Sequence, residues 1–220
     1  MNHESERLEL VRIAKSLFDR GYVHSTAGNV SSRLPDGAGY LVTPTDACLG
    51  FLEPEALAHV NSLGVHVSGA RPTKALSLHR EIYASDLSAN CVIHTHSTAL
   101  VALSILGVWS ERDILPPLTA YQVIKVGHVP HIPFAAPGDP GVSNLVSRQI
   151  AASSAAGQNL RAVMLERLGP TVWHDSPSNA MALLEELTET AQLWLTSNRS
   201  ASPLRPDQLA AVRDRFGVGW

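Results

Sequence analysis

Apolar and polar residues follow two different periods along the chain, and together they predict a protein of the mixed α/β class. Apolar residues at helical spacing, with helix start and stop signals, predict main helices over 6–20, 73–83, 97–106, 142–152 and 179–195. Short runs rich in β-branched residues predict strands over 40–42, 91–96, 123–126, 131–134, 162–165 and 171–173. A length of 220 residues favours one domain.

The connecting segments carry turn and loop signals. The small, polar residues 25–32 are interpreted as a loop, and glycine, proline and asparagine mark further turns and a hairpin over 60–67. Near the end, a proline-marked linker over 200–206 precedes a predicted final helix over 207–216. We therefore expect residues 1–198 to form the main domain and residues 199–220 to be a linker and helix that extend it.

Composition excludes several classes of partner. The chain has 17 basic and 20 acidic residues without a basic stripe, so nucleic acid is not an expected partner. The first residues are charged, and no apolar run reaches the length of a membrane span, which predicts a cytoplasmic protein without membrane contact. Cys48 and Cys91 form no metal-binding or disulfide motif, and we expect both to be reduced and buried.

The clearest candidate for chemistry is a pair of histidines at the end of a predicted strand. His94 and His96 are two residues apart, so their side chains project from one face and can converge on a metal ion. The spacing alone is not specific, because surface or core histidines also occur in such pairs. The residues by themselves therefore leave both interpretations open.

Five motifs place the pair in a specific context. In chain order they are Thr26-Ala27-Gly28-Asn29-Val30-Ser31, Leu41-Val42-Thr43-Pro44-Thr45, Ser68-Gly69-x-x-Pro72-Thr73-Lys74, Val92-Ile93-His94-Thr95-His96-Ser97 and Pro137-Gly138-Asp139-Pro140. In order and spacing they resemble the class II aldolase family from about residue 8 to about residue 196. Within that family the chain is most similar to the branch of decarboxylases that act on 3-oxo-tetronate 4-phosphates.

The resemblance implies a fold, an assembly and a chemistry. The implied fold is a three-layer α/β/α domain with a mainly antiparallel central sheet, assembled as a homotetramer with sites between subunits. Enzymes of this family bind a small-molecule substrate and hold a divalent metal, usually zinc, with three histidines. The metal and a carboxylate acid/base stabilise an enediolate beside a phosphate anchor.

Carried over residue by residue, the resemblance assigns roles to most of the motif residues. His94 and His96 match two metal ligands, and the substrate-binding residues it implies are Gly28, Asn29, Thr45, Thr73 and Lys74. Tyr121 matches a tyrosine that reaches the neighbouring subunit's site in related enzymes. From the residues alone, Gly28-Asn29 is equally an ordinary turn, and Tyr121 is equally an aromatic residue packed at an interface.

Three positions depart from the family pattern. The catalytic glutamate is replaced by Ala75, the third metal histidine by Leu168, and the glycine after Thr45 by Asp46. Glu166 is a candidate third ligand, in a two-histidine, one-carboxylate set that suits zinc, manganese or iron. Asp46 is a candidate acid/base, and further candidate ligands are His66, His128 and His131.

These observations favour a lyase-type enzyme that stabilises an enolate-like intermediate of a small oxygenated acid or sugar phosphate. The altered ligand set leaves open a metal-free or iron-dependent enzyme on the same fold, in which His94, His96 and Tyr121 supply acid/base catalysis. A non-catalytic, adducin-like assembly domain is the alternative from another class. Retention of His94 and His96 together with Asn29, Thr73 and Lys74 favours an enzyme over this alternative.

Overall fold

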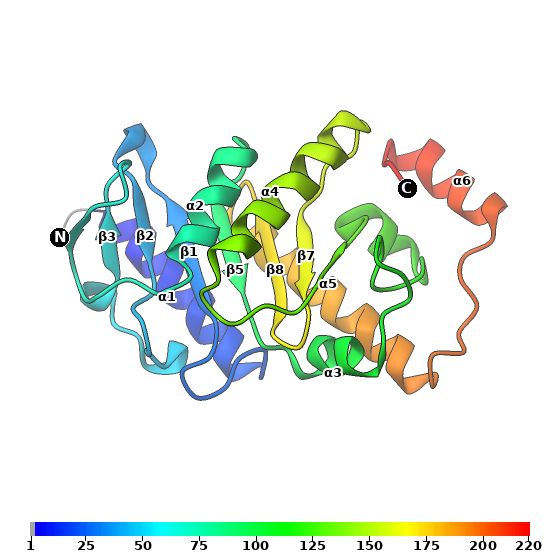
Figure 1. Ribbon diagram of the computed structural model, residues 1–220, viewed down its shortest axis with the longest axis horizontal. Helices are drawn as coiled ribbons and strands as arrows, with labels where there is room; N and C mark the ends of the chain where they lie inside the picture. Colours follow the sequence, from blue (N-terminus) through cyan, green and yellow to red (C-terminus); the bar gives the residue numbers. More distant parts are fainter. Residues whose placement is uncertain (1–2) are drawn as a thin grey trace.

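The computed structural model describes residues 3–220 and shows one mixed sheet between two layers of helices (Figure 1). The strands within the described chain lie in the order β4-β3-β2-β1-β5-β8-β7-β6, and every pair is antiparallel except β6 with β7. This arrangement confirms the expected mainly antiparallel sheet. The strands are β1 (Asn29–Arg33), β2 (Tyr40–Val42), β3 (Ala58–Val60), β4 (His66–Ser68), β5 (Cys91–His94), β6 (His131–Ile132), β7 (Ala162–Leu165) and β8 (Gly169–His174).

Helices cover both faces of the sheet. α1, α3 and α5 pack on one face, and α2 and α4 pack on the other, which confirms the three-layer α/β/α arrangement (Figure 1). The six predicted helices are present, with ends that differ by a few residues: α1 (Glu4–Asp19), α2 (Leu76–Ser85), α3 (Thr98–Leu106), α4 (Pro140–Ala155), α5 (Pro177–Thr196) and α6 (Pro206–Phe216). Single helical turns lie at η1 (Pro35–Gly37), η2 (Leu49–Phe51) and η3 (Pro54–Ala56).

β5 is buried on both faces, and its alternation sets the direction of the histidine pair. Cys91 and Ile93 belong to the core under α1 and α5, whereas Val92 belongs to the core under α2 and α4. Because successive side chains point to opposite faces of a strand, His94 shares the face of Val92. The pair of histidines therefore lies on the side of the sheet that α2 and α4 cover.

Residues 25–32 were expected to form a loop, and this prediction is wrong for their second half. Asn29–Arg33 forms β1, which pairs with β2 on one side and with β5 on the other. Small polar residues have low intrinsic preference for strands, but two neighbouring strands satisfy their backbone hydrogen-bonding groups and override that preference. Val30 and Ser31 are completely buried as a result.

The strand predicted over 123–126 is also wrong, because the segment forms a helical turn of the π type, η4 (Gln122–Val126). The Gln122 backbone N–H bonds to Thr119 Oγ1, and the Gln122 side chain accepts from Leu118 N and donates to Pro116 O. These local hydrogen bonds stabilise the helical turn, which ends at Gly127 with φ 69°. Their contribution outweighs the preference of the β-branched residues for a strand. The predicted burial of Cys48 is wrong as well, since Cys48 is partly exposed, whereas Cys91 is buried and both are free.

The C-terminal segment lies at one end of the sheet (Figure 1). α6 contacts η4, and the Trp220 ring stacks on His128 with 4.6 Å between ring centroids. The assignment of residues 199–220 as an extension of the main domain stays a prediction, and these contacts are in keeping with it. No helix within residues 3–220 is long and apolar enough to cross a membrane.

A close backbone approach joins β8 to the histidine segment. Gly169, at φ 139°, begins β8, and a Cβ atom placed on it would lie 1.9 Å from the Thr95 carbonyl oxygen. Thr95 lies between the two histidines, and its N–H donates to the Pro170 carbonyl at 3.2 Å. Only glycine allows the two backbones to meet here.

We predict that Gly169→Ala lowers the free energy of unfolding by about 2 kcal/mol or more, because it adds a steric clash to the cost of an unfavourable φ. The matched control is Gly157→Ala, since Gly157 has φ 71° but nothing within 4 Å of an added Cβ. This control should cost only about 1 kcal/mol, the backbone term alone. Denaturant unfolding measures both values, and equal losses would contradict the proposed contact.

Candidate active site

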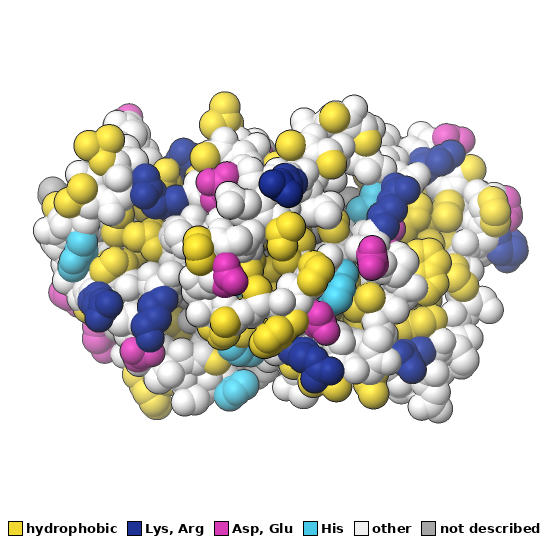
Figure 2. Space-filling view, in the orientation of Figure 1, with side chains coloured by type: hydrophobic (Ala, Val, Ile, Leu, Met, Phe, Trp, Pro, Cys, Tyr) yellow, Lys and Arg dark blue, Asp and Glu magenta, His cyan; other side chains and the backbone are white. Residues whose placement is uncertain are grey.

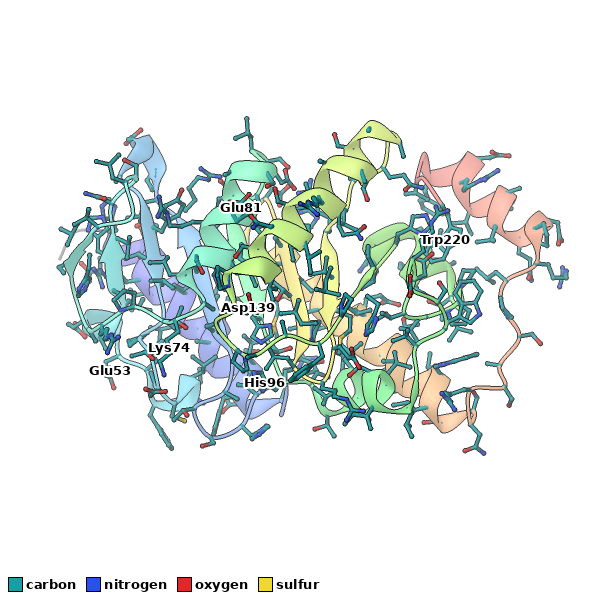
Figure 3. The ribbon with its side chains drawn as sticks, in the orientation of Figure 1. Glu53, Lys74, Glu81, His96, Asp139 and Trp220 are labelled. Atoms are coloured by element: carbon teal, nitrogen blue, oxygen red, sulfur yellow. The ribbon has the colours of Figure 1, made fainter. Side chains whose placement is uncertain are left out.

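A cavity of about 250 Å³ lies where the end of β5 meets α2 and the loop before α4. Its polar wall is formed by Asn29, Thr73, Lys74, His94, His96, Asp139 and Glu166. Figure 3 shows Lys74, His96 and Asp139 on the same side of the molecule, near the lower ends of α2 and α4. Figure 2 shows hydrophobic side chains on the surface around this region, and apolar residues such as Ile132, Pro133 and Val142 line the cavity itself. The cavity is therefore lined by both polar and apolar groups.

His94 and His96 meet at the floor of the cavity as the sequence predicted. Their ring centroids are 5.1 Å apart at an angle of 73°, and His94 is only 5% exposed. Thr171 lies opposite His94 in the β5–β8 register, and its Oγ1 is 3.0 Å from His94 Nδ1. This contact, together with a hydrogen bond to the Pro170 backbone, fixes the His94 ring at the cavity.

Burial keeps both imidazoles neutral. Loss of solvent, with smaller contributions from His96 and His79, lowers the pKa of His94 to about 3. Burial and the neighbouring His24 also lower the pKa of His96. Neutral rings are able to accept a hydrogen bond, donate one or ligate a metal, whereas imidazolium ions cannot ligate.

The residues present fit two positions of a metal site and do not fit the third. Leu168 lines the cavity at the place where the resemblance expects a histidine, and it has no donor atom. Glu166 also lines the cavity, but its Oε2 accepts from Phe134 N at 2.9 Å and its Oε1 lies 3.7 Å from Arg167 Nε. Among residues 3–220, no three His, Cys, Asp or Glu side chains converge closely enough to hold an ion.

The predicted substrate-binding residues are only partly brought together. Asn29, Thr73 and Lys74 line the cavity, together with Ala75 at the position of the missing glutamate. Gly28, at φ 83°, permits β1 to approach β5, because an added Cβ would lie 3.0 Å from the His94 carbonyl oxygen. The cavity therefore has one cationic side chain and two polar ones on the wall that the resemblance assigns to phosphate.

Thr45 and Asp46 lie outside the cavity wall. The Thr45 backbone N–H donates to the Arg71 carbonyl at 2.9 Å, and the exposed Asp46 has φ 57°. A contact of 3.4 Å joins Thr45 Oγ1 to the Asp46 carboxylate. The structure thus does not bring Asp46 to the histidines, and its role as a replacement acid/base stays a prediction.

Tyr121 does not line the cavity of its own chain either. Its side chain is 61% exposed, with Lys125 Nζ 5.3 Å from the ring centroid. An exposed position on the surface is what a residue that reaches a neighbouring subunit requires, and that role stays a prediction. The other candidate ligands, His66, His128 and His131, also lie away from the cavity wall.

Sequence reasoning missed several polar residues of the site. Ser77, Asp139 and Ser143 line the cavity, and Asp139 also caps α4 by accepting from Gly141 N at 2.7 Å. The Pro-Gly-Asp-Pro motif carried the signal for Asp139. A buried hydrogen-bonded group beneath Asn29, centred on His79, was not found because its members come from β1 and α2, which are far apart in the chain.

The sequence profile of the class II aldolase and adducin N-terminal domain matches residues 8–195. The chain belongs to this family. It is 50% identical to a Cupriavidus necator protein named 3-oxo-tetronate 4-phosphate decarboxylase, with both chains covered completely. It is 37% identical to the protein of the same name from Escherichia coli K12, with 96% of each chain covered.

Solved structures agree with this assignment. YgbL from Escherichia coli, described as a candidate aldolase/epimerase/decarboxylase, superposes with a TM-score of 0.86 at 36% identity, covering 96% of this chain and 98% of YgbL. An L-fuculose 1-phosphate aldolase shares the fold with a TM-score of 0.83 at 20% identity, covering 99% and 98%. The protein is thus an aldolase/decarboxylase-like lyase of a family that generally uses a divalent metal.

Buried neutral histidines make the fold sensitive to acid. Burial lowers the pKa of His79 to about 3, as it does for His94, whereas an unfolded histidine titrates near 6.5. Between these values the unfolded chain binds more protons than the folded chain, so the free energy of unfolding falls as pH falls from 6.5 toward 3. Each such histidine contributes a slope of up to about 1.4 kcal/mol per pH unit.

We predict that His79→Gln makes the loss of stability between pH 7 and pH 5 less steep, because glutamine does not titrate. The measurement is guanidinium unfolding at several pH values. The matched control is His66→Gln, which removes an exposed histidine and should leave the pH dependence unchanged. An unchanged slope in His79→Gln would show that His79 does not titrate far below 6.5 in the folded protein.

Proposed function

We propose that the protein removes CO2 from a 3-oxo-tetronate 4-phosphate. Support comes from the full-length similarity to decarboxylases named for that substrate, and from a cavity lined by the cationic Lys74 and by a pair of neutral imidazoles. The observation that carries the proposal is the combination of Lys74, His94 and His96 with Ala75 at the glutamate position. The chemistry of decarboxylation explains why this combination is sufficient.

A 3-oxo acid reacts without a base. The carboxylate is already ionised, so the C–C bond breaks with release of CO2 and its electron pair moves to the ketone oxygen as an enediolate. Protonation of the carbon then gives dihydroxyacetone phosphate. Aldol cleavage, in contrast, starts with removal of a hydroxyl proton and requires a general base. Loss of the carboxylate at Ala75 therefore harms aldol cleavage more than decarboxylation.

Different residues of the cavity bind different parts of the substrate. Lys74, Thr73 and Asn29 hold the phosphate, with Lys74 supplying the charge-assisted contact. His94 and His96 lie at the floor, where a neutral ring N–H donates to the ketone oxygen. The proton that the enediolate carbon receives comes from water, because a neutral imidazole that released its proton would become an imidazolate. Apolar lining residues such as Ile132 and Val142 lower the effective dielectric constant and so strengthen these contacts.

A divalent cation, when bound, would add positive charge beside the enediolate oxygen. His94 and His96 are the residues that would hold it, and zinc is the ion we propose because it suits imidazole ligands. Glu166 would complete the set only if its carboxylate turned away from Phe134 N. With two firm protein ligands, we expect the metal to bind weakly.

Location and assembly belong to the same proposal. A phosphorylated small-molecule substrate favours the cytoplasm. The exposed Tyr121, together with exposed apolar residues such as Trp109 and Leu193, favours burial against further copies of the chain. The homotetramer implied by the resemblance would place Tyr121 at the neighbouring site.

The proposal predicts CO2 release from 3-oxo-tetronate 4-phosphate and much slower cleavage of L-fuculose 1-phosphate. Lys74→Met should lower kcat/KM by about 10- to 100-fold, mainly through KM, because it removes a charge-assisted contact to the phosphate. Lys15→Met is the matched control, since Lys15 is exposed on α1 and pairs with Asp19. Coupled assays of CO2 and dihydroxyacetone phosphate measure both reactions.

A wild-type protein that releases no CO2, or a Lys74→Met variant whose kcat/KM equals that of Lys15→Met, would contradict the proposal.

Titration of metal-free protein with zinc tests the metal site separately. Leu168→His adds a third imidazole at the cavity wall and should raise the zinc affinity by at least about tenfold. Leu168→Asn should not, and similar affinities of all three proteins would contradict weak two-histidine binding.

A further inference from the structure

A chain of buried hydrogen bonds lies directly beneath the anion-binding wall. His79 is fully buried on α2, with Nε2 2.7 Å from Asn29 Oδ1 and Nδ1 2.7 Å from Ser31 Oγ. Ser31 Oγ is in turn 2.8 Å from the hydroxyl of Tyr83. Each of these groups is at most 8% exposed, so water does not compete for the bonds.

The direction of the chain follows from proton counting. Asn29 Oδ1 has no hydrogen, so His79 Nε2–H must donate to it. A neutral ring has a single N–H, so His79 Nδ1 accepts, and Ser31 Oγ–H donates to it. The Ser31 oxygen then accepts from the Tyr83 hydroxyl. One consistent order therefore runs from Tyr83 through Ser31 and His79 to Asn29.

The first member of the chain is held in place. The Tyr83 ring stacks on Tyr40 with 4.9 Å between centroids and an interplanar angle of 15°. The Arg33 guanidinium lies 4.9 Å from the centroid of the same ring. Burial also raises the pKa of Tyr83 well above its usual value, so the hydroxyl keeps the proton that it donates.

The last member of the chain faces the cavity. Asn29 lines it, and within residues 3–220 no hydrogen bond engages its Nδ2. We propose that His79 is a positioning residue that locks the Asn29 amide with its oxygen turned inward, so that both Nδ2 hydrogens face the phosphate of the substrate. The proposal rests on the function proposed above, because it assigns the anion to this wall.

Reversing the direction of these hydrogen bonds would turn the Asn29 amide the other way. If Ser31 donated to Tyr83, His79 Nδ1–H would donate to Ser31, and Nε2 would have to accept from Asn29 Nδ2. The Asn29 oxygen would then point at the cavity, where its lone pairs repel an anion. Only the first order presents donors alone, which suits a phosphate and disfavours a cation at the same place.

Calorimetry tests this positioning role by comparing the binding of dihydroxyacetone phosphate with that of unphosphorylated dihydroxyacetone. Ser31→Ala removes the hydroxyl that donates to His79 Nδ1, so either ring nitrogen of His79 can carry the proton. His79→Leu removes the hydrogen bond to Asn29 Oδ1 altogether. Both should weaken binding of the phosphorylated ligand by about 10- to 100-fold and leave the unphosphorylated ligand unaffected. His79→Gln keeps a donor towards Asn29 and should restore most of the affinity.

The control is Ser32→Ala, which removes a hydroxyl from the same strand. Ser32 Oγ donates to Asn90 O at 3.2 Å, and among residues 3–220 His79 hydrogen-bonds to Asn29 and Ser31 rather than to Ser32. Phosphate-ligand affinity in this variant should equal that of the wild type. Equal affinity in Ser31→Ala, His79→Leu and Ser32→Ala would overturn the positioning role while leaving the proposed function intact.

The tautomer of His79 gives a second readout that does not depend on any variant folding. In the wild type, nitrogen-15 NMR should show the proton on Nε2 and none on Nδ1. A proton on Nδ1 would overturn the proposal even if the enzyme is active. A wild-type protein that binds both ligands equally would instead show that the wall binds no phosphate, which overturns the proposed function and this inference together.

Discussion

The central position of β5 is the constraint on which the rest of the structure depends. β1 pairs with it on one side, placing Asn29 opposite His94, and β8 pairs on the other, placing Thr171 opposite His94. Gly28 and Gly169 allow the neighbouring backbones to approach closely at this point. Asn29 of the proposed anion-binding wall, the histidine pair and the residue that contacts His94 are thus brought together by the register of three adjacent strands.

Burial gives this arrangement its chemical character. Loss of solvent lowers the pKa of His94 to about 3 and also lowers that of His96, so the floor of the cavity carries neutral rings. Lys74 is the cation at its wall. Ala75 and Leu168 stand where the family resemblance expects an acid/base and a third ligand, and we propose that the site still binds a phosphorylated oxo acid. No carboxylate stands at position 75 to remove a proton at the start of a reaction, which is why the proposed decarboxylation fits the residues better than aldol cleavage.

Much of this was visible in the sequence, and the failures have physical reasons. Helical periodicity gave the helices, and the period of two gave the common face of His94 and His96. The strand over 29–33 was not predicted because its polar residues are stabilised by partner strands distant in sequence. The strand over 123–126 was predicted wrongly because Gln122 and Thr119 form local hydrogen bonds that periodicity cannot reveal. The motifs located Asn29, Thr73 and Lys74, whereas the exclusion of Thr45 and Asp46 from the cavity wall required the fold. The network through His79 is invisible to motif reasoning because each of its bonds joins β1 to α2.

A crystal structure of the protein with dihydroxyacetone phosphate bound tests the account most directly, because this ligand is the product expected from decarboxylation. The account predicts the phosphate between Asn29, Thr73 and Lys74, with the ketone oxygen within hydrogen-bonding distance of an imidazole nitrogen of His94 or His96. A ligand bound in the opposite direction, with its phosphate at the histidines, would contradict it, as would a ligand bound outside this cavity.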